Sequence, residues 1–255
     1  MRPTVLAVML ALALPVVAPA KTPGTPKTPA YVTTAINDPA RDSDRKDDEH
    51  RHMVEIMAFS QVKPGQNVLE LVPGGGYWTR VFSGIVGPTG HVYTIWPKEM
   101  MEHIAKPYAT WTALAATPHY ANVSVSGQSI APLDAPARKV DLVFTVQNYH
   151  DFHDVLDPAG VATLDKQVYD ALKPGGLFVV IDHVAPAGSG LAATNTTHRI
   201  DPAVVRKEIE AAGFVFDGES GLLGNPADPH DKLVFDPAIR GHTDQFIYRF
   251  RKPAK

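Results

Sequence analysis

The stretch 68–79 constrains the fold of this chain more than any other part of the sequence. An apolar run that carries one carboxylate, Glu70, passes through the consecutive glycines Gly74, Gly75 and Gly76 and enters an amphipathic segment. The apolar residues of that segment recur at helical spacing: Trp78, Val81, Phe82, Ile85 and Val86. A glycine turn between a buried strand and a helix lets backbone N–H groups approach a ligand beside the positive end of the helix. We therefore expect a nucleotide-cofactor site at these glycines.

After residue 64 the chain alternates apolar runs with amphipathic segments. The expected strands are 67–72, 91–96, 122–126, 141–146, 177–181, 214–216 and 245–250. The expected helices are 77–86, 98–106, 110–116, 161–172 and 202–212. Continuously apolar strands separated by amphipathic helices indicate a mostly parallel sheet that is covered on both faces. The sequence thus predicts one doubly wound α/β domain, with its ligand at the carboxyl ends of the strands, where the strand order reverses.

Residues 1–20 have the features of a secretory signal peptide. Arg2 precedes an uncharged, mostly apolar run over 5–17, and small residues allow cleavage after Ala20. The run is shorter than the ~20 apolar residues of a membrane span, and a signal anchor is the alternative for such a pattern. We expect an exported protein, periplasmic or secreted, that is not stably inserted in a membrane after cleavage. Residues 21–40 are expected to form a flexible lead-in, and residues 41–255 the folded domain.

Composition argues against several classes of function. The chain has no cysteine, which excludes a disulfide framework, thiolate metal ligands and a cysteine nucleophile. It has 24 basic and 27 acidic residues and a formal net charge of -3, so it offers no strongly basic face. Nucleic acid is therefore not an expected partner.

Several segments together resemble class I S-adenosylmethionine-dependent methyltransferases. The segment 70–76, Glu-Leu-Val-Pro-Gly-Gly-Gly, looks like their motif I, and 172–181 and 141–146 are similar to their fifth and fourth strands. The segments 211–214 and 244–252 resemble their closing helix and hairpin. Within this superfamily, the chain more specifically resembles predicted methyltransferases that carry a signal peptide. It implies a Rossmann-like sheet of seven strands with an antiparallel closing strand, S-adenosylmethionine as cofactor, and a small-molecule acceptor.

The resemblance also suggests which residues contact the cofactor. Those residues are Glu70, Gly74, Gly75, Gly76, Tyr77, Trp96, Gln128 and Asn148. A dinucleotide fingerprint starting at Gly74 would require glycine at position 79, where the chain has Thr79, so NAD is disfavoured. Trp96 stands where the family commonly has an acid that binds the ribose. It either stacks on the ribose or adenine or belongs to the core, and Gln128 either contacts the adenine or is an exposed loop residue.

A second group of polar residues, 148–154, follows the fourth expected strand. Histidine is the side chain best suited to take a proton near neutral pH, and a neighbouring carboxylate can orient it. We expect His150 to be the general base and Asp151 to orient it. Asn148 and Tyr149 are expected to frame the methionine end of the cofactor, and Tyr149 is a further catalytic candidate. The simpler interpretation is that this segment caps a loop or helix.

Histidines also follow later strands, which brings a metal ion into consideration. His150, His183 and His198, together with a carboxylate, have donor atoms suited to zinc, iron or manganese, although their spacing matches no diagnostic motif. Arg199 either holds an anionic acceptor or pairs with a carboxylate such as Asp201. Methyl transfer is the leading function. A metal-assisted hydrolase or lyase on the same fold, and a non-catalytic binding protein that has lost the cofactor, are the alternatives.

Overall fold

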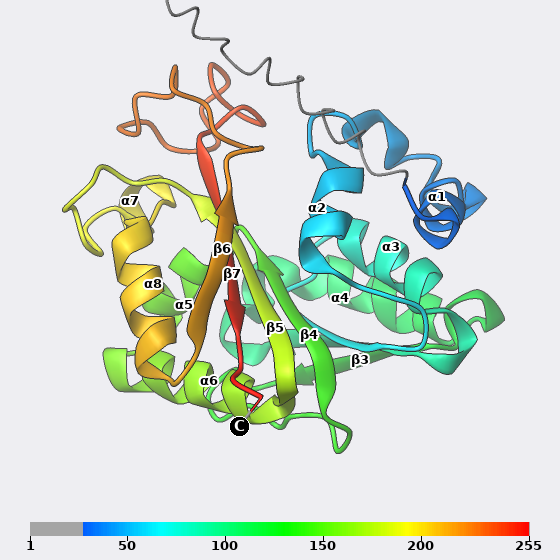
Figure 1. Ribbon diagram of the computed structural model, residues 1–255. Coiled ribbons are helices and arrows are strands. Elements are labelled where there is room, and N and C mark those ends of the chain that lie inside the picture. Colours follow the sequence, from blue (N-terminus) through cyan, green and yellow to red (C-terminus); the bar gives the residue numbers. More distant parts are fainter. Residues whose placement is uncertain (1–27, 255) are drawn as a thin grey trace, which may run out of the picture.

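The structure is a computed structural model that describes residues 28–254 (Figure 1). Its centre is one seven-stranded sheet with the order β3-β2-β1-β4-β5-β7-β6. The strands are β1 (Asn67–Leu71), β2 (His91–Pro97), β3 (Val123–Gln128), β4 (Val140–Val146), β5 (Leu172–His183), β6 (Val215–Ser220) and β7 (Gln245–Arg251). Only β7 is antiparallel, and it pairs with β5 on one side and β6 on the other. The predicted doubly wound, mostly parallel sheet with an antiparallel closing strand is confirmed.

Helices cover both faces of the sheet. They are α1 (Ala30–Ile36), α2 (Met53–Ser60), α3 (Tyr77–Val86), α4 (Met101–Ala115), α5 (Tyr149–Val155), α6 (Pro158–Ala171), α7 (Thr194–Thr197) and α8 (Pro202–Ala211). The strand order reverses between β1 and β4, so right-handed crossovers place α3 and α4 on one face and α6 and α8 on the other. β1, β4 and β5 are almost wholly buried because both of their faces are covered.

Two expected helices between β2 and β3 are one continuous helix. The sequence predicts separate helices over 98–106 and 110–116, but α4 runs unbroken through Pro107 and is preceded by a short 3-10 turn. Ile104 and Trp111 are buried on the inner side of α4. Packing of this one face therefore outweighs the local preference of proline to end a helix.

The ordered domain begins earlier than the sequence predicts. Residues 30–36 of the expected lead-in form α1, which packs on α3 and buries Val32 and Ala35. Gly84 on α3 permits this contact, because a Cβ at that position would lie 2.8 Å from the Cβ of Ala35. The prediction of a flexible lead-in over 21–40 is therefore wrong for residues 30–36, which form a helix. The expected signal peptide and its cleavage site lie outside the described residues.

Two segments that are distant in sequence lie at the carboxyl end of the parallel strands. The chain from residue 41 to α2 and the long connection between β6 and β7, residues 221–244, both extend to the end of the sheet opposite the C-terminus (Figure 1). Among residues 28–254, no helix has the length and apolar character needed to cross a bilayer. The carboxyl edge is thus bordered by added segments, as expected for a ligand site.

Candidate active site

The glycine turn after β1 lines a cavity of about 320 Å³, which we call the glycine-turn cavity. Its walls come from β1 and the turn, α3, the end of β4 and the N-terminal segment. Its lining includes Asp44, Asp47, Arg51, Glu70, Leu71, Val72, Pro73, Gly74, Gly75, Tyr77, Trp78, Arg80, Val146, Gln147 and Asn148. Five residues that the sequence predicts as cofactor contacts are therefore brought together here: Glu70, Gly74, Gly75, Tyr77 and Asn148.

The three glycines of the turn have different roles. Gly74 and Gly76 have positive φ angles of 56° and 74°, which disfavour any residue with a Cβ. A Cβ at Gly74 or Gly75 would meet nothing within 4 Å, whereas one at Gly76 would lie 1.9 Å from Nε1 of Trp111. Gly76, a predicted cofactor contact, does not line the cavity and is required by close packing against α4, whereas Gly74 and Gly75 leave space for a ligand.

Glu70 connects the turn to the first turn of α3. Its buried carboxylate accepts a hydrogen bond of 2.6 Å from Oγ1 of Thr79. Burial raises the pKa of Glu70 to about 7, although the Thr79 hydrogen bond and the charge of Arg80 act in the opposite direction. Glu70 therefore has a carboxyl group that changes its charge near neutral pH at the wall of the cavity.

The N-terminal segment 41–52 builds a wall that sequence reasoning did not predict. Arg41 is fully buried and binds Asp48, which also accepts a 2.6 Å hydrogen bond from the hydroxyl of Tyr77. The guanidinium of Arg51 lies over the Tyr77 ring, 4.5 Å from its centroid. Asp44 forms a bidentate ion pair with Arg80 of α3. The high charge density of 41–51 is the sequence signal that could have predicted this wall, because charged side chains that become buried need partners of opposite charge.

Two predicted cofactor residues lie away from this cavity. Trp96 is fully buried, donates a hydrogen bond from Nε1 to Oγ1 of Thr94, and packs edge-on against Tyr108 of α4. The side-chain amide of Gln128 donates to the carbonyl of Asp134 and accepts from its backbone N–H, and these two hydrogen bonds stabilise the loop after β3. Trp96 is thus a core residue and Gln128 a loop clasp, and the alternative in which each contacts the cofactor is not supported.

Asn148 and Tyr149 point in different directions. The amide of Asn148 donates to the carbonyl of Val72, at 3.2 Å, and so holds the end of β4 to the glycine turn. Tyr149 is fully buried, and its hydroxyl lies 2.8 Å from Asp165 and 3.3 Å from Glu208, between α6 and α8. Burial and these carboxylates raise its pKa well above the usual value. Tyr149 therefore does not frame the cofactor, and its catalytic role has no geometric support.

His150 is positioned by a residue other than the predicted one. Its Nδ1 lies 2.8 Å from Oδ1 of buried Asp182, at the end of β5, while Asp151 lies 3.3 Å from Nε2. The orienting carboxylate is therefore Asp182. Burial opposes the charge on the ring, but Asp182 and Asp151 outweigh it and raise the pKa of His150 to about 10. The ring lines neither the glycine-turn cavity nor the larger cavity that adjoins it, so its predicted role as base gains no support from its position.

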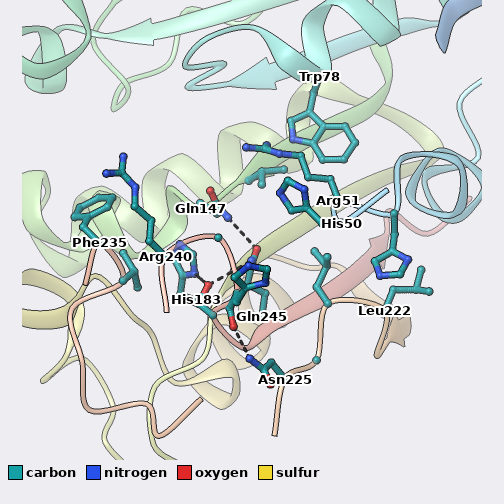
Figure 2. Close-up of a pocket in the computed structure, with 18 residues that line it drawn as sticks. His50, Arg51, Trp78, Gln147, His183, Leu222, Asn225, Phe235, Arg240 and Gln245 are labelled. Carbon is teal, nitrogen blue, oxygen red and sulfur yellow. Dashed lines mark hydrogen bonds between the residues drawn. The ribbon is translucent and has the colours of Figure 1, made fainter. Parts of the chain in front are cut away.

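A second cavity, of about 540 Å³, adjoins the first, and we call it the acceptor-side cavity. It shares Arg51, Trp78, Val146 and Gln147 with the glycine-turn cavity. Figure 2 shows Arg51 near Trp78, Gln147 hydrogen-bonded to Gln245, and Phe235 beside Arg240. The connection 221–244 supplies most of the remaining lining, including Leu222, Leu223, Asn225, Val234, His242 and Thr243.

The acceptor-side cavity has a one-sided charge. Within the described part of the chain, residues 28–254, its lining contains Arg51, Arg240 and four histidines but no aspartate or glutamate. His183 is one of them; its Nδ1 lies 2.7 Å from Oγ1 of Thr243, and burial lowers its pKa to about 4. The lining thus favours a ligand that carries negative charge.

Arg199 anchors the connection 221–244 and lines neither cavity. It is fully buried, and its two terminal nitrogens lie 2.9 and 3.0 Å from the carboxylate of Asp228. Asp201, the partner suggested by the sequence, instead accepts from the amide of Ala203 and caps α8. The expectation that Arg199 pairs with a carboxylate is correct, but the partner lies 29 residues away.

Comparison with known proteins agrees with this geometry. Residues 46–198 match the ubiE/COQ5 methyltransferase family. A curated relative, the ubiquinone/menaquinone biosynthesis C-methyltransferase UbiE of Ectopseudomonas mendocina, is 27% identical over 188 residues, which are 73% of this chain and 63% of the relative. A protein-L-isoaspartate O-methyltransferase of Methanosarcina mazei is 29% identical over 54% of this chain and 48% of the relative. The chain thus spans less than two thirds of the length of these relatives.

Solved structures share the fold at low sequence identity. A SAM dependent methyltransferase from Aquifex aeolicus has a TM-score of 0.53 at 17% identity and covers 87% of this chain and 98% of its own. The [4+2]-cyclase SpnF has a TM-score of 0.57 at 17% identity and covers 81% of each chain. The cyclase shows that this fold also serves other reactions, so the fold alone does not assign the activity. The match over residues 46–198 does establish the family: the chain belongs to the ubiE/COQ5 methyltransferase family.

Proposed function

We propose that this protein transfers a methyl group from S-adenosylmethionine to a small anionic acceptor. The observation that carries the proposal is the pair of adjoining cavities at the carboxyl edge of the sheet, which share Arg51, Trp78 and Gln147. Methyl transfer requires little beyond alignment of a nucleophile with the methyl carbon, so donor and acceptor must meet at one boundary. Family membership supports the choice of cofactor.

The glycine-turn cavity has features that fit the cofactor. When bound, S-adenosylmethionine supplies an electrophilic methyl group on a positively charged sulfur. Gly75 leaves open space at the turn. Nε1 of Trp78 and Nε of Arg51 are buried donors with no hydrogen-bond partner among the described residues, and both side chains line the boundary of the two cavities. Buried donors of this kind are costly unless a ligand supplies an acceptor atom.

The chemistry of the acceptor follows from the second cavity. Arg51 and Arg240 favour an anion, while Trp78, Leu222 and Phe235 offer apolar surface. A phenolate or a carboxylate attached to a flat apolar body has both properties. The curated UbiE relatives are named as C-methyltransferases of ubiquinone and menaquinone biosynthesis. The charge of the cavity supports a related acidic acceptor, which we would seek first among phenols.

Two histidines are candidates for handling the acceptor proton. His150 remains the base predicted from the sequence, but its ring lines neither cavity and contacts Asp182 and His198. His183 lines the acceptor-side cavity and has its Nδ1 fixed by Thr243. We therefore propose His183 as the imidazole that contacts the acceptor.

Export of the protein is a separate proposal that rests on the sequence of residues 1–20. Cleavage after Ala20 would leave a mature chain beginning at Lys21. Fractionation of the producing cells and mass measurement of the exported chain would test it. A protein found in the cytosol with residues 1–20 still attached would overturn it.

Binding of the cofactor tests the proposed function directly. We expect calorimetric titration of the full chain to give micromolar binding of S-adenosylmethionine and S-adenosylhomocysteine. Gly75→Val should weaken binding at least about tenfold, because its side chain enters the cavity without backbone strain or a clash. Gly221→Val is a matched control, since this exposed glycine also has open space at its Cβ and lines neither cavity. Absence of binding by the unaltered chain would refute the proposal.

A further inference from the structure

A cluster of imidazole and carboxylate groups lies beside the acceptor-side cavity without lining it. Nε2 of His150 is 3.3 Å from Nδ1 of His198 and 3.3 Å from Oδ1 of Asp151, and the latter two atoms are 3.5 Å apart. These three residues come from α5 and from the turn that follows α7. Three donor atoms from two separate segments thus converge on one point.

The spacing of these atoms matches the coordination shell of a small divalent cation. Zinc–nitrogen and zinc–oxygen bonds of about 2.0–2.1 Å place the ligand atoms of a tetrahedral site about 3.3–3.4 Å apart. The three separations in the cluster, 3.3, 3.3 and 3.5 Å, therefore form one triangular face of such a tetrahedron. His150 is buried, whereas the side chains of Asp151 and His198 are 21% and 33% exposed. The fourth position of the tetrahedron is therefore accessible to water.

A further carboxylate holds the first imidazole in the orientation that a metal ion needs. Oδ1 of Asp182 lies 2.8 Å from Nδ1 of His150, and Oδ2 accepts from the His150 backbone amide. A ring that keeps only the proton on Nδ1, directed at Asp182, presents the lone pair of Nε2 to Asp151 and His198, so a bound cation takes the place of the Nε2 proton. Metal-ligating histidines commonly have such a carboxylate partner on the other ring nitrogen.

We propose that His150, Asp151 and His198 bind a divalent cation of the zinc class, with Asp182 as the outer partner of His150. Nitrogen and oxygen donors without a thiolate suit zinc and, more weakly, cobalt. The sequence also suggested His183 as a ligand, but among the described residues only His150, Asp151 and His198 bring their ligand atoms together, and Nδ1 of His183 is engaged by Thr243. The site does not depend on the proposed methyl transfer.

The position of the site gives the cation a structural consequence. His198 follows α7 directly, and its ring packs against Phe235, which lines the acceptor-side cavity. A bound cation would join α5 to this turn and so fix one border of the cavity. It would also occupy Nε2 of His150, the residue that the sequence predicts as the general base.

Metal titration of the untagged, chelator-treated full chain tests the proposal. Calorimetry with Zn²⁺ should give one site per chain with a micromolar or lower dissociation constant, and Zn²⁺ should raise Tm. His198→Ala should weaken binding by more than the ~10–100-fold that is typical for loss of an outer partner, and Asp182→Asn should weaken it within that range. His119→Ala is the matched control, because His119 is an exposed histidine that pairs with Asp38 far from the cluster. It should leave the affinity unchanged.

Two results of the Zn²⁺ titration would decide against the site. Stoichiometric binding that survives His198→Ala would place the metal elsewhere, and no saturable binding of Zn²⁺ by the unaltered chain would mean that the cluster is only a hydrogen-bonded network. Co²⁺ provides a second readout that does not depend on activity. An absorption spectrum of the four-coordinate type supports the proposed geometry, and a weak six-coordinate spectrum would overturn it. Because His198 is partly exposed, its replacement should leave the fold intact, which circular dichroism checks.

Discussion

The three glycines of the turn after β1 should respond very differently to alanine. Gly75 has ordinary backbone angles and open space, so Gly75→Ala should stabilise the fold by about 0.4–1 kcal/mol through the unfolded chain. Gly74→Ala meets no atom but must adopt a left-handed φ of 56°, which costs about 1–2 kcal/mol. Gly76→Ala has the same strain and also a Cβ 1.9 Å from the Trp111 indole. Overpacking adds about 1–3 kcal/mol, for a total loss of about 2–5 kcal/mol.

Urea unfolding of the three variants, monitored by tryptophan fluorescence and circular dichroism, measures these differences. The free energy of unfolding should decrease in the order Gly75→Ala, Gly74→Ala, Gly76→Ala. The double variant Gly76→Ala/Trp111→Ala separates strain from clash, because removal of the indole should abolish the additional effect of the Gly76 substitution. Equal destabilisation by Gly75→Ala and Gly76→Ala would refute the assignment of Gly76 to packing and Gly75 to the cavity.

Three further predictions concern charge and proton binding. Burial raises the pKa of Glu70 from 4.5 to about 7 in the folded chain. Between about pH 4.5 and 7 the folded state therefore binds more protons than the unfolded state. The free energy of unfolding should fall by about 3 kcal/mol as the pH rises through this window. Glu70→Gln should remove that slope from urea unfolding measured across the window, and a retained slope would assign it to other groups. Asp228→Asn leaves Arg199 buried without its carboxylate, so it should cost about 3–5 kcal/mol and speed hydrogen exchange in 221–244; an unaltered exchange rate there would contradict the anchoring role. His183→Asn should lower kcat and leave cofactor affinity unchanged, and wild-type turnover would exclude contact with the acceptor.

The sheet could be predicted from the sequence because its signals are local and strong. The helix expected over 77–86 has the same bounds as α3, since glycine precedes it, glycine follows it, and its apolar residues recur at helical spacing. The expected strand 141–146, mostly apolar after Asp141, and the continuously apolar strand 177–181 lie within β4 and β5. The glycine turn was predicted as a ligand site for the same reason, and its cavity contains five of the predicted residues.

The fine assignment of side chains could not be predicted, because it depends on partners that are remote in the chain. Asp151 was predicted to orient His150 because it is the next residue in the sequence. The carboxyl ends of parallel strands meet at one edge of the sheet, however, and this brings Asp182, at the end of β5, within 2.8 Å of Nδ1 of His150. The hydroxyl of Tyr77 is bound by Asp48, 29 residues earlier. Only the folded arrangement shows that the charged segment 41–52 forms a wall of the site.

These remote contacts explain how the site departs from the usual arrangement that the resemblance implies, in which an acid after the second strand binds the ribose. At the end of β2 the chain has Trp96, which is buried beneath Tyr108, and the neighbouring space at Gly76 is filled by Trp111. Aromatic packing from α4 thus occupies that edge. Asp44 and Asp47, on a segment that precedes the whole sheet, line the glycine-turn cavity. Because Asp44 is engaged by Arg80, Asp47 is the carboxylate better placed to accept a hydrogen bond from a ligand hydroxyl.

Asp47→Asn should therefore weaken S-adenosylmethionine binding while leaving the free energy of unfolding unchanged. Equal affinity in both chains would show that the ribose is held elsewhere.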